Sequence, residues 1–338
     1  MNLRAGIQAR KSAQQLYKTN RGKLMKTIAA SLATVLGYAT VAFSKPPPPP
    51  PPPPYNPQIL YTATSKGGST ATITVSNADG TDVVSLYTSK NITGLNDLKF
   101  APSGNQIVFS EQNDIKVLTY AVSSQGVTTT SVNTLASEPY TVVHADVSPD
   151  GTQLLFVEHT ADPNQWAVYV MGMNGGLPTR TQVPLAPGMY PDAVWANSNS
   201  RIAVIQGAPV EAGFGIQTIQ VIDLDTGYGI ASNTPVFTST ASQLYQVLRL
   251  ESAHSSDTLL FAAYPPPAGS NSGVYTVEIG TMAVTAIAAG RSASFSADDS
   301  TVLFQGAVAG DLFTLNLNTN VQTQITSRVL LGRPDFLP

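Results

Sequence analysis

Residues Ala145–Phe156 read ADVSPDGTQLLF, and this stretch decides the fold. Its first residues have the composition of a short strand, and its last four, QLLF, form a second apolar run. Between the two runs, Ser148-Pro149-Asp150-Gly151 places Pro at the second and Gly at the fourth position of a type I turn. Glycine accepts the left-handed conformation that closes such a turn. The stretch therefore predicts a tight β-hairpin.

Four other segments repeat this pattern, and together with the first they indicate an array of similar units. They are LKFAPSGNQIVF at 98–109, AVWANSNSRIAV at 193–204, LESAHSSDTLLF at 250–261 and ASFSADDSTVLF at 293–304. The five starts are separated by 47, 48, 57 and 43 residues. These intervals suit a four-stranded propeller blade. We assign the longer third interval to loops at Ala208–Gly215 and Asp225–Thr234, and expect another loop at Pro265–Pro267.

The two ends of the array complement each other. Residues 57–88 supply only three strands, near 58–64, 70–76 and 82–88, and the final RPDFLP at Arg333–Pro338 aligns with the first strand of a unit. We therefore expect the C-terminal strand to complete the N-terminal blade. The predicted fold is all-β: a six-bladed β-propeller with four-stranded antiparallel blades and a closed ring. Closure removes the exposed sheet edges that favour aggregation.

The repeat resembles that of TolB-type six-bladed propellers, in which an aromatic-Ser-Pro-Asp-Gly segment precedes an apolar run. The match is nearest at Val147–Phe156, good at Phe100–Phe109 and Phe295–Phe304, and degenerate at 193–204 and 250–261. The resemblance covers residues 57–338 and implies a propeller that binds an envelope protein. TolB proteins carry a small α/β domain before the propeller, whereas a polyproline run stands there in this chain.

Composition and charge exclude several classes of protein. Cysteine is absent and only three histidines occur, which excludes disulfide scaffolds and thiolate metal sites. Residues 1–54 hold eight Lys or Arg and no acid, whereas the remainder holds ten Lys or Arg and all 21 acids, a net charge of −11. An acidic body repels phosphate backbones, so no nucleic-acid partner is expected.

The first 56 residues have the pattern of an export signal and a spacer. Seven basic residues precede the uncharged run Thr27–Phe43, and the small residues Ala42 and Ser44 stand at suitable −3 and −1 positions for cleavage. Residues 1–44 are predicted to be a cleaved signal peptide or, alternatively, an uncleaved inner-membrane anchor through 27–43. Nine prolines at 46–54 predict a polyproline II stalk, so residues 45–56 are a linker. A periplasmic or secreted propeller over 57–338 follows.

No catalytic motif accompanies the propeller pattern. Gly-x-Ser-x-Gly, His-Glu-x-x-His and Gly-x-Gly-x-x-Gly are all missing from the sequence, and no cofactor or metal is predicted. His144, His159 and His254 are dispersed over two units and are interpreted as ordinary structural histidines.

One polar position recurs near the start of each first strand. It is held by Asp97, His144, Asp192, Arg249, Ser292 and Arg333. First strands line the channel of a propeller, so these six residues are candidates for a ligand-binding set at one channel mouth. Polar residues are also expected there if strand starts are simply solvated, and this explanation is favoured. Trp195 is expected in the core between blades, whereas Tyr190 and Tyr245 are candidates to face a partner.

Three functions are compatible with these observations. The leading hypothesis is an exported, non-enzymatic propeller that serves as a protein-binding or scaffold module in the cell envelope. Its partner would be another envelope or extracellular protein, with membrane contact only through an uncleaved N-terminal segment. The first alternative is a channel-centred, metal-dependent hydrolase or lactonase-like enzyme, which would need Asp97, His144 and Asp192 to converge without pairing to Arg249 and Arg333. The second alternative is a stalked surface adhesion module.

Overall fold

The computed structural model describes ten stretches of the chain. These are residues 58–64, 69–90, 95–162, 165–173, 180–210, 213–239, 246–264, 272–307, 310–326 and 330–337. The chain divides at Pro53/Pro54, and all described residues lie in the second, compact unit, Pro54–Pro338. The predicted signal segment 1–44 and linker 45–56 lie outside the described residues. In the described part, no helix is long and apolar enough to span a membrane.

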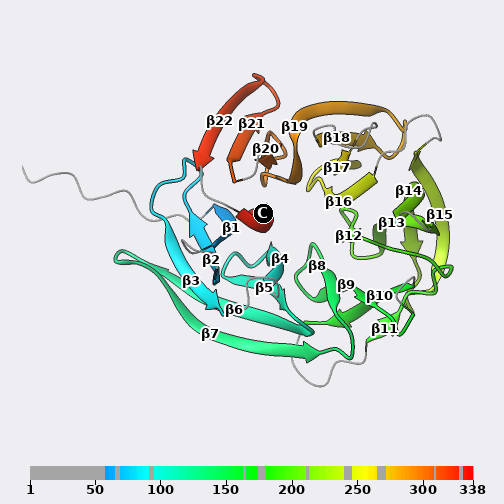
Figure 1. The fold of residues 1–338 in the computed structure, drawn as a ribbon, viewed down its shortest axis with the longest axis horizontal. Helices are drawn as coiled ribbons and strands as arrows, with labels where there is room; N and C mark the ends of the chain where they lie inside the picture. The colour runs from blue at the N-terminus through cyan, green and yellow to red at the C-terminus, as the bar shows by residue number, and fades with distance from the viewer. Residues whose placement is uncertain are drawn as a thin grey trace, which may run out of the picture. The chain divides into compact units, whose positions relative to one another are not determined.

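The described residues of the second unit form a β-propeller fold with antiparallel, four-stranded blades (Figure 1). The first sheet has the order β23-β1-β2-β3 and consists of Leu330–Phe336, Ile59–Thr64, Ala71–Ser76 and Val84–Ser89. The second consists of β4 Leu95–Phe100, β5 Gln106–Glu111, β6 Asp114–Ser123 and β7 Gly126–Ser137. The third consists of β8 Val142–Val147, β9 Gln153–His159, β10 Trp166–Gly172 and β11 Thr181–Gln182. The fourth consists of β12 Ala193–Trp195, β13 Arg201–Val210, β14 Gly213–Leu224 and β15 Ile230–Thr238.

The last sheet is a continuous ribbon of seven strands in the described residues. It runs through β16 Gln246–Ser252, β17 Thr258–Tyr264, β18 Gly273–Glu278, β19 Val284–Phe295, β20 Thr301–Gly306, β21 Leu312–Asn316 and β22 Val321–Thr326. The first half of the long strand β19 pairs with β18, and its second half pairs with β20. The strand β19 therefore serves as the last strand of one four-stranded group and the first strand of the next.

The hairpins predicted from the repeated motif are confirmed. The Gly151 N–H donates to the Ser148 carbonyl at 2.8 Å, and the Gly104 N–H donates to the Ala101 carbonyl at 2.9 Å. Both glycines have φ of +72°, the left-handed conformation that the turn requires. The side chain of Ser148 reinforces its turn, because its Oγ accepts a bond from the Gln153 N–H at 2.9 Å. Local turn chemistry thus determines the register of the first two strands.

The turn between β2 and β3 lies against the last strand group. Gly80 has φ of +79°, and a Cβ atom added there would come within 2.6 Å of the Ile325 carbonyl oxygen on β22. The first sheet and β22 are therefore in direct backbone contact, although they are far apart in sequence. Only a residue without a side chain fits this contact.

Gly80→Ala is expected to destabilise the protein by about 2–4 kcal/mol. The cost combines a left-handed φ for alanine with a clash against backbone that cannot rotate away. The matched control is Gly126→Ala, because Gly126 has φ of +120° but open space around the added Cβ. Urea unfolding of both variants measures the difference. Equal destabilisation would mean that the turn does not pack on β22.

First strands lie nearest the centre of the propeller in Figure 1, and each contacts the first strand of the next group. The strand β23 contacts both β4 and β19. The remaining neighbouring pairs of first strands are β4 with β8, β8 with β12, β12 with β16, and β16 with β19. Side chains on these strands therefore meet at the centre.

The core lies mainly between neighbouring sheets. One cluster joins Leu60 and Ile73 of the first sheet to Phe100 and Phe109 of the second. Trp195, 2% exposed, packs among residues of the third and fourth sheets, which confirms its predicted place between blades. Each sheet thus buries both faces against its neighbours.

Three sequence-based expectations were wrong here, and two others cannot be followed. The loop expected at Asp225–Thr234 ends before Ile230, where strand β15 begins. Tyr190 is 2% exposed and donates its hydroxyl hydrogen to the Ala186 carbonyl, so it packs inside instead of facing a partner. The segment 208–215 is not a long loop: β13 and β14 continue into it, and Val210 pairs with Gly213. Residues 208–210 and 213–215 belong to paired strands, although their small side chains had indicated a loop. Tyr245 and Pro265–Pro267 lie outside the described residues.

Candidate functional site

The candidate site lies where the first strands meet, and it is built from two layers of polar side chains. We call Asp97, His144, Asp192, Arg249, Ser292 and Arg333 the first polar layer. Two residues further along five of these segments stand Lys99, Asp146, Glu251, Ser294 and Asp335, which we call the second polar layer. Residues i and i+2 of a strand point to the same side, so both layers face the centre.

Irregular strand pairing accompanies the first polar layer. The pairing register shifts between Asn96 and Leu98, between Val142 and His144, and between Val247 and Arg249. It also shifts between Gly290 and Ala293, on either side of Ser292. Bulges of this kind re-aim side chains. Asp97 itself has φ of +39°, which shows that the backbone twists locally to place its carboxylate.

The first polar layer is buried instead of solvated. Asp97, His144, Asp192 and Arg333 are at most 4% exposed, and Arg249 is half-buried. The explanation that these positions are polar because strand starts are solvated is therefore wrong. Burying so many polar groups requires that they satisfy one another.

Four members of the first polar layer form one network. The Arg333 guanidinium donates to Asp192 Oδ2 at 3.0 Å, and its Nη1 lies 2.9 Å from His144 Nδ1. His144 Nε2 lies 3.1 Å from Asp192 Oδ1, and its Nδ1 lies 3.4 Å from Asp97 Oδ1. His144 therefore contacts the guanidinium of Arg333 and the carboxylates of both Asp97 and Asp192.

Two groups in this network keep unused hydrogen-bonding capacity. Within the described residues, Asp97 Oδ2 and Arg333 Nε are buried without a partner. Burial opposes the ionisation of Asp97, but His144 and the charges of Arg249 and Arg333 hold the pKa of its carboxyl below the usual value. Asp97 is therefore an ionised carboxylate with one unpartnered oxygen.

The second polar layer surrounds a single lysine with three carboxylates. Lys99 Nζ is bonded to Glu251 Oε1, and it lies 3.4 Å from Asp335 Oδ1 and 3.8 Å from Asp146 Oδ1. Sequence reasoning missed this layer because it examined only one position per strand. The alternation of side chains along a strand predicts this layer, because residue i+2 points to the same side as residue i.

Carboxylates of these layers also join neighbouring sheets. Asp335 Oδ2 accepts the Phe100 N–H at 2.8 Å, and Asp146 Oδ2 accepts the Trp195 N–H at 2.8 Å. Asp192 Oδ2 accepts the Leu250 N–H at 2.7 Å in the same way. In each case an acid on a first strand, or directly before one as Asp192 is before β12, bonds to the backbone of the next first strand. The polar centre therefore contributes to the assembly of the blades as well as to the site.

Three carboxylates compete for one positive charge. Burial raises the pKa of Asp146 and of Asp335, with Lys99 opposing this and Glu251 adding to it. Burial also disfavours ionised Glu251, but Lys99 and Arg333 together hold the pKa of Glu251 below its usual value. Burial likewise disfavours charged Lys99, yet the three carboxylates raise the pKa of Lys99. The second polar layer therefore places three carboxylates around one lysine, and burial makes Asp146 and Asp335 harder to ionise than an exposed aspartate.

Asp146→Asn is expected to become more stable relative to the wild type as the pH rises from 4 to 8. A carboxyl whose folded pKa is raised binds more protons in the folded state, so its ionisation lowers the stability of the wild type as the pH rises. Asparagine does not titrate and avoids this loss. Denaturant unfolding at pH 4, 6 and 8 measures the trend.

The exposed turn residue Asp298 is the matched control for this series. Hydrogen bonds from Ser296 and Ser300 lower the pKa of its carboxyl, so Asp298→Asn should show the opposite trend with pH. The same sign for both variants would contradict the raised pKa assigned to Asp146.

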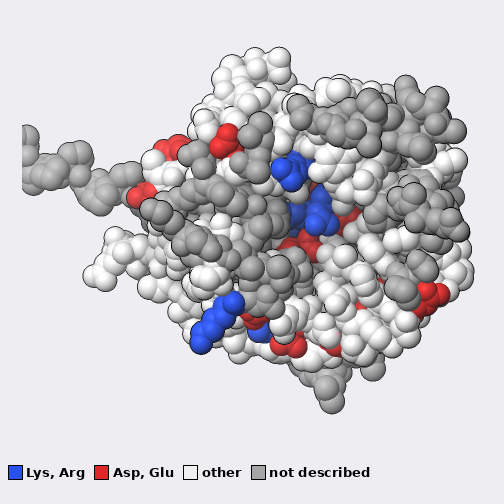
Figure 2. All heavy atoms as spheres, viewed as in Figure 1, with Lys and Arg blue, Asp and Glu red and all other residues white. Residues whose placement is uncertain are grey.

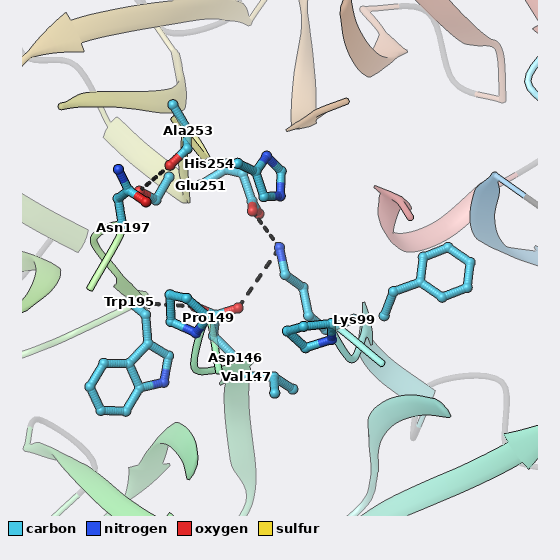
Figure 3. A pocket seen from close by; sticks show the side chains of 12 residues that line it. Lys99, Asp146, Val147, Pro149, Trp195, Asn197, Glu251, Ala253 and His254 are labelled. Carbon is cyan, nitrogen blue, oxygen red and sulfur yellow. Dashed lines mark hydrogen bonds and ion pairs between the residues drawn. The ribbon is translucent and has the colours of Figure 1, made fainter. Parts of the chain in front are cut away.

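A pocket of about 240 Å³ opens beside the second polar layer at the hairpin-turn end of the first strands. Its charged lining is Lys99, Asp146, Glu251 and His254, and its apolar lining includes Phe100 and Trp195. Figure 3 shows the Lys99 ammonium between the carboxylates of Asp146 and Glu251. The site thus combines a charged floor with apolar walls.

Charged side chains are concentrated at the centre in the surface view as well. Figure 2 shows blue and red side chains together in the hollowed middle of the face that it draws, while most of the other described surface there is uncharged. Within the described residues, no group of three or more His, Asp or Glu side chains has a geometry that could hold a metal ion. The groups at the centre can bind and orient charged partners through hydrogen bonds and ion pairs.

The fold is a β-propeller similar to that of TolB proteins, and the polar centre lies where its first strands meet. The structure is similar to TolB from Acinetobacter baumannii, with a TM-score of 0.62 and 15% identity over 85% of this chain and 68% of that one. It is also similar to a TolB candidate from Agrobacterium tumefaciens, with a TM-score of 0.57 and 11% identity over 84% and 99% of the two chains. An oligogalacturonate lyase from Vibrio parahaemolyticus has a TM-score of 0.50 and 9% identity over 80% and 79%.

At these identities the likeness concerns the fold alone. No protein-family model and no curated protein sequence matches the chain. Because one fold hosts many functions, the function must be argued from the site.

Proposed function

We propose that this chain is an exported, non-enzymatic β-propeller that acts as a protein-binding or scaffold module in the cell envelope. The observation that carries the proposal is the state of the central charged groups. They are engaged with one another in a buried network, and beside them a pocket with apolar walls opens to the surface. A rigid centre with an open, mixed pocket is suited to recognition.

The architecture in this proposal is a ring of six blades closed by β23. Three observations support it. The pairing of β23 with β1 adds a fourth strand to the first sheet, and the division of β19 between β18 and β20 splits the seven-stranded ribbon into two groups. The contacts of β23 with both β4 and β19 support closure.

Export and the stalk rest on the sequence. We propose residues 1–44 as a signal peptide or membrane anchor, 45–56 as a polyproline linker and 57–338 as the propeller. A periplasmic or secreted location follows. The TolB name of two structurally similar proteins is in keeping with an envelope role.

The enzymatic alternative is less well supported by the first polar layer. A channel-centred hydrolase would need Asp97, His144 and Asp192 free to hold a metal ion or activate water. Arg333 instead donates to Asp192 and contacts both ring nitrogens of His144. Dismantling such a buried pair costs several kcal/mol.

Affinity capture with crosslinking tests the proposal. The tagged full-length chain is captured from the envelope of its native host, with the tag fused to residues 1–56 alone as the control. A protein that co-purifies in fixed stoichiometry with the full chain but not with the control is expected. Mass spectrometry of the same sample should place the mature N-terminus near Ser44. Repeated captures without such a protein would reject the binding-module function.

A further inference from the structure

The pocket beside the second polar layer contains two carboxylates that are buried but not fully used. The side chains of Asp146 and Glu251 are 6% and 7% exposed. Asp146 Oδ2 accepts the Trp195 N–H, whereas the nearest cation to its Oδ1 is Lys99 Nζ at 3.8 Å, beyond hydrogen-bond distance. Glu251 Oε1 is bonded to Lys99, and no described residue donates to its Oε2. Both side chains line the pocket.

The charge around the pocket is unbalanced. Across both polar layers, Lys99, Arg249 and Arg333 supply three positive charges against five carboxylates, those of Asp97, Asp146, Asp192, Glu251 and Asp335. Buried charges are costly unless they are paired, so one further cation placed against Asp146 and Glu251 would remove part of this cost. An anionic ligand would add a negative charge beside these carboxylates, and Lys99 could not offset it because all three acids already engage Lys99.

The walls and the size of the pocket restrict the form of this cation. Phe100, Val147 and Trp195 supply apolar surface, and Pro102 and Pro149 stand in the surrounding turns. Such walls suit the aliphatic stem of a long basic side chain, whose charged head would reach the carboxylates. The volume of about 240 Å³ is below the roughly 300–1,000 Å³ typical of small-molecule sites. The space therefore fits one inserted side chain better than a larger ligand.

We propose that this pocket receives the side chain of a basic residue, arginine or lysine, from a partner protein. The head group would lie in the pocket against the carboxylates of Asp146 and Glu251, both of which face Lys99 in Figure 3. A guanidinium suits two carboxylates particularly well, because it presents several donors in a fixed plane. The inference rests on the proposed function, since it names the group by which the propeller would hold its partner.

Binding of small probes to the full chain tests the pocket without the partner. The probe is Nα-acetyl-L-arginine methylamide, and its neutral isostere, Nα-acetyl-L-citrulline methylamide, is the control. Chemical shifts in NMR spectra measure both affinities. The arginine probe is expected to bind at least about tenfold more tightly than the citrulline probe, and more weakly as salt is added. Equal affinities of the two probes would overturn the proposal.

Matched variants locate the binding. Glu251→Gln and Asp146→Asn are each expected to weaken the arginine probe about tenfold, whereas Glu278→Gln, at an exposed acid, should leave it unchanged. Near-UV circular dichroism checks that each variant is folded. If Glu251→Gln does not fold, the test rests on Asp146→Asn. That variant is expected to fold, because the asparagine oxygen can still accept the Trp195 N–H. Unchanged affinity in a folded Asp146→Asn variant would overturn the proposal.

Two further results separate this inference from the proposed function. The same titration is made with calcium chloride at matched ionic strength. If calcium binds and Glu251→Gln abolishes that binding, while the arginine probe does not bind, the pocket is a metal site and the inference is overturned. A captured partner that still binds the Glu251→Gln and Asp146→Asn variants would leave the binding-module function intact and reject this pocket. If the arginine probe binds but no partner protein is captured, the pocket is a site for basic groups and the protein-binding function is rejected.

Discussion

Deletion of Leu330–Pro338 is expected to abolish the cooperative unfolding of the propeller. The strand β23 pairs with β1, and Phe336 is buried against Ile59, Tyr61 and Leu303. Without β23, the β1 edge loses its partner, and the centre loses both Arg333 and Asp335. The combined loss is comparable with the whole stability of an ordinary domain, about 5–15 kcal/mol. Differential scanning calorimetry should show no sharp transition.

Complementation in trans provides the control for this deletion. A synthetic peptide of residues 330–338 should restore a cooperative transition when it is added in excess, because the strand would pair with β1 as it does in the intact chain. A scrambled peptide of the same composition should not. An unchanged transition in the deletion variant would show that the C-terminal strand does not complete the first sheet.

Arg333→Met is expected to destabilise the propeller by about 3–5 kcal/mol. Methionine keeps much of the apolar stem but leaves Asp192, which is 0% exposed, as an uncompensated buried charge. It also removes the donor that faces His144. Urea unfolding at pH 7 measures the loss. The expected cost is large because the penalty is the desolvation of the stranded carboxylate and not merely the loss of one bond.

A surface arginine supplies the matched control. Arg201 pairs with Asp223 at 2.9 Å and with Asp257 at 3.2 Å, but these side chains are 33%, 47% and 64% exposed. Water solvates them in any case, so Arg201→Met should cost less than about 1 kcal/mol. In the Arg333→Met background, a further Asp192→Asn should cost little or restore stability. If Arg333→Met were as mild as Arg201→Met, the central network would not stabilise the fold.

Local turn chemistry explains how much of the fold could be predicted. The Pro-x-Gly hairpins at Ala101–Gly104 and Ser148–Gly151 encode their own geometry within four residues, and the structure reproduces them. The three N-terminal strands begin within two residues of their predicted positions. The alignment of the C-terminal tail with a first strand predicted the pairing of β23 with β1. These features depend on short-range sequence, or on repetition of it.

Predictions failed where contacts distant in sequence decided the outcome. Tyr190 has the surroundings of an exposed loop residue, but packing of the third and fourth sheets buries it. The segment 208–215 is rich in small residues, yet pairing between β13 and β14 continues into it. Neither contact leaves a mark in the local sequence. The second polar layer, by contrast, was available from the i+2 periodicity of the first strands.

The sequence by itself determined the repeated units, their hairpins and the positions that face the centre, because turn residues and strand alternation act over a few residues. Only the tertiary structure decided what the central residues do. Arg333, Asp192 and His144 are about 50 to 190 residues apart, and their pairing exists only when three different sheets meet. Whether a polar side chain is solvated, paired or left with a free oxygen depends on which neighbours burial supplies, and that is a property of the assembled fold.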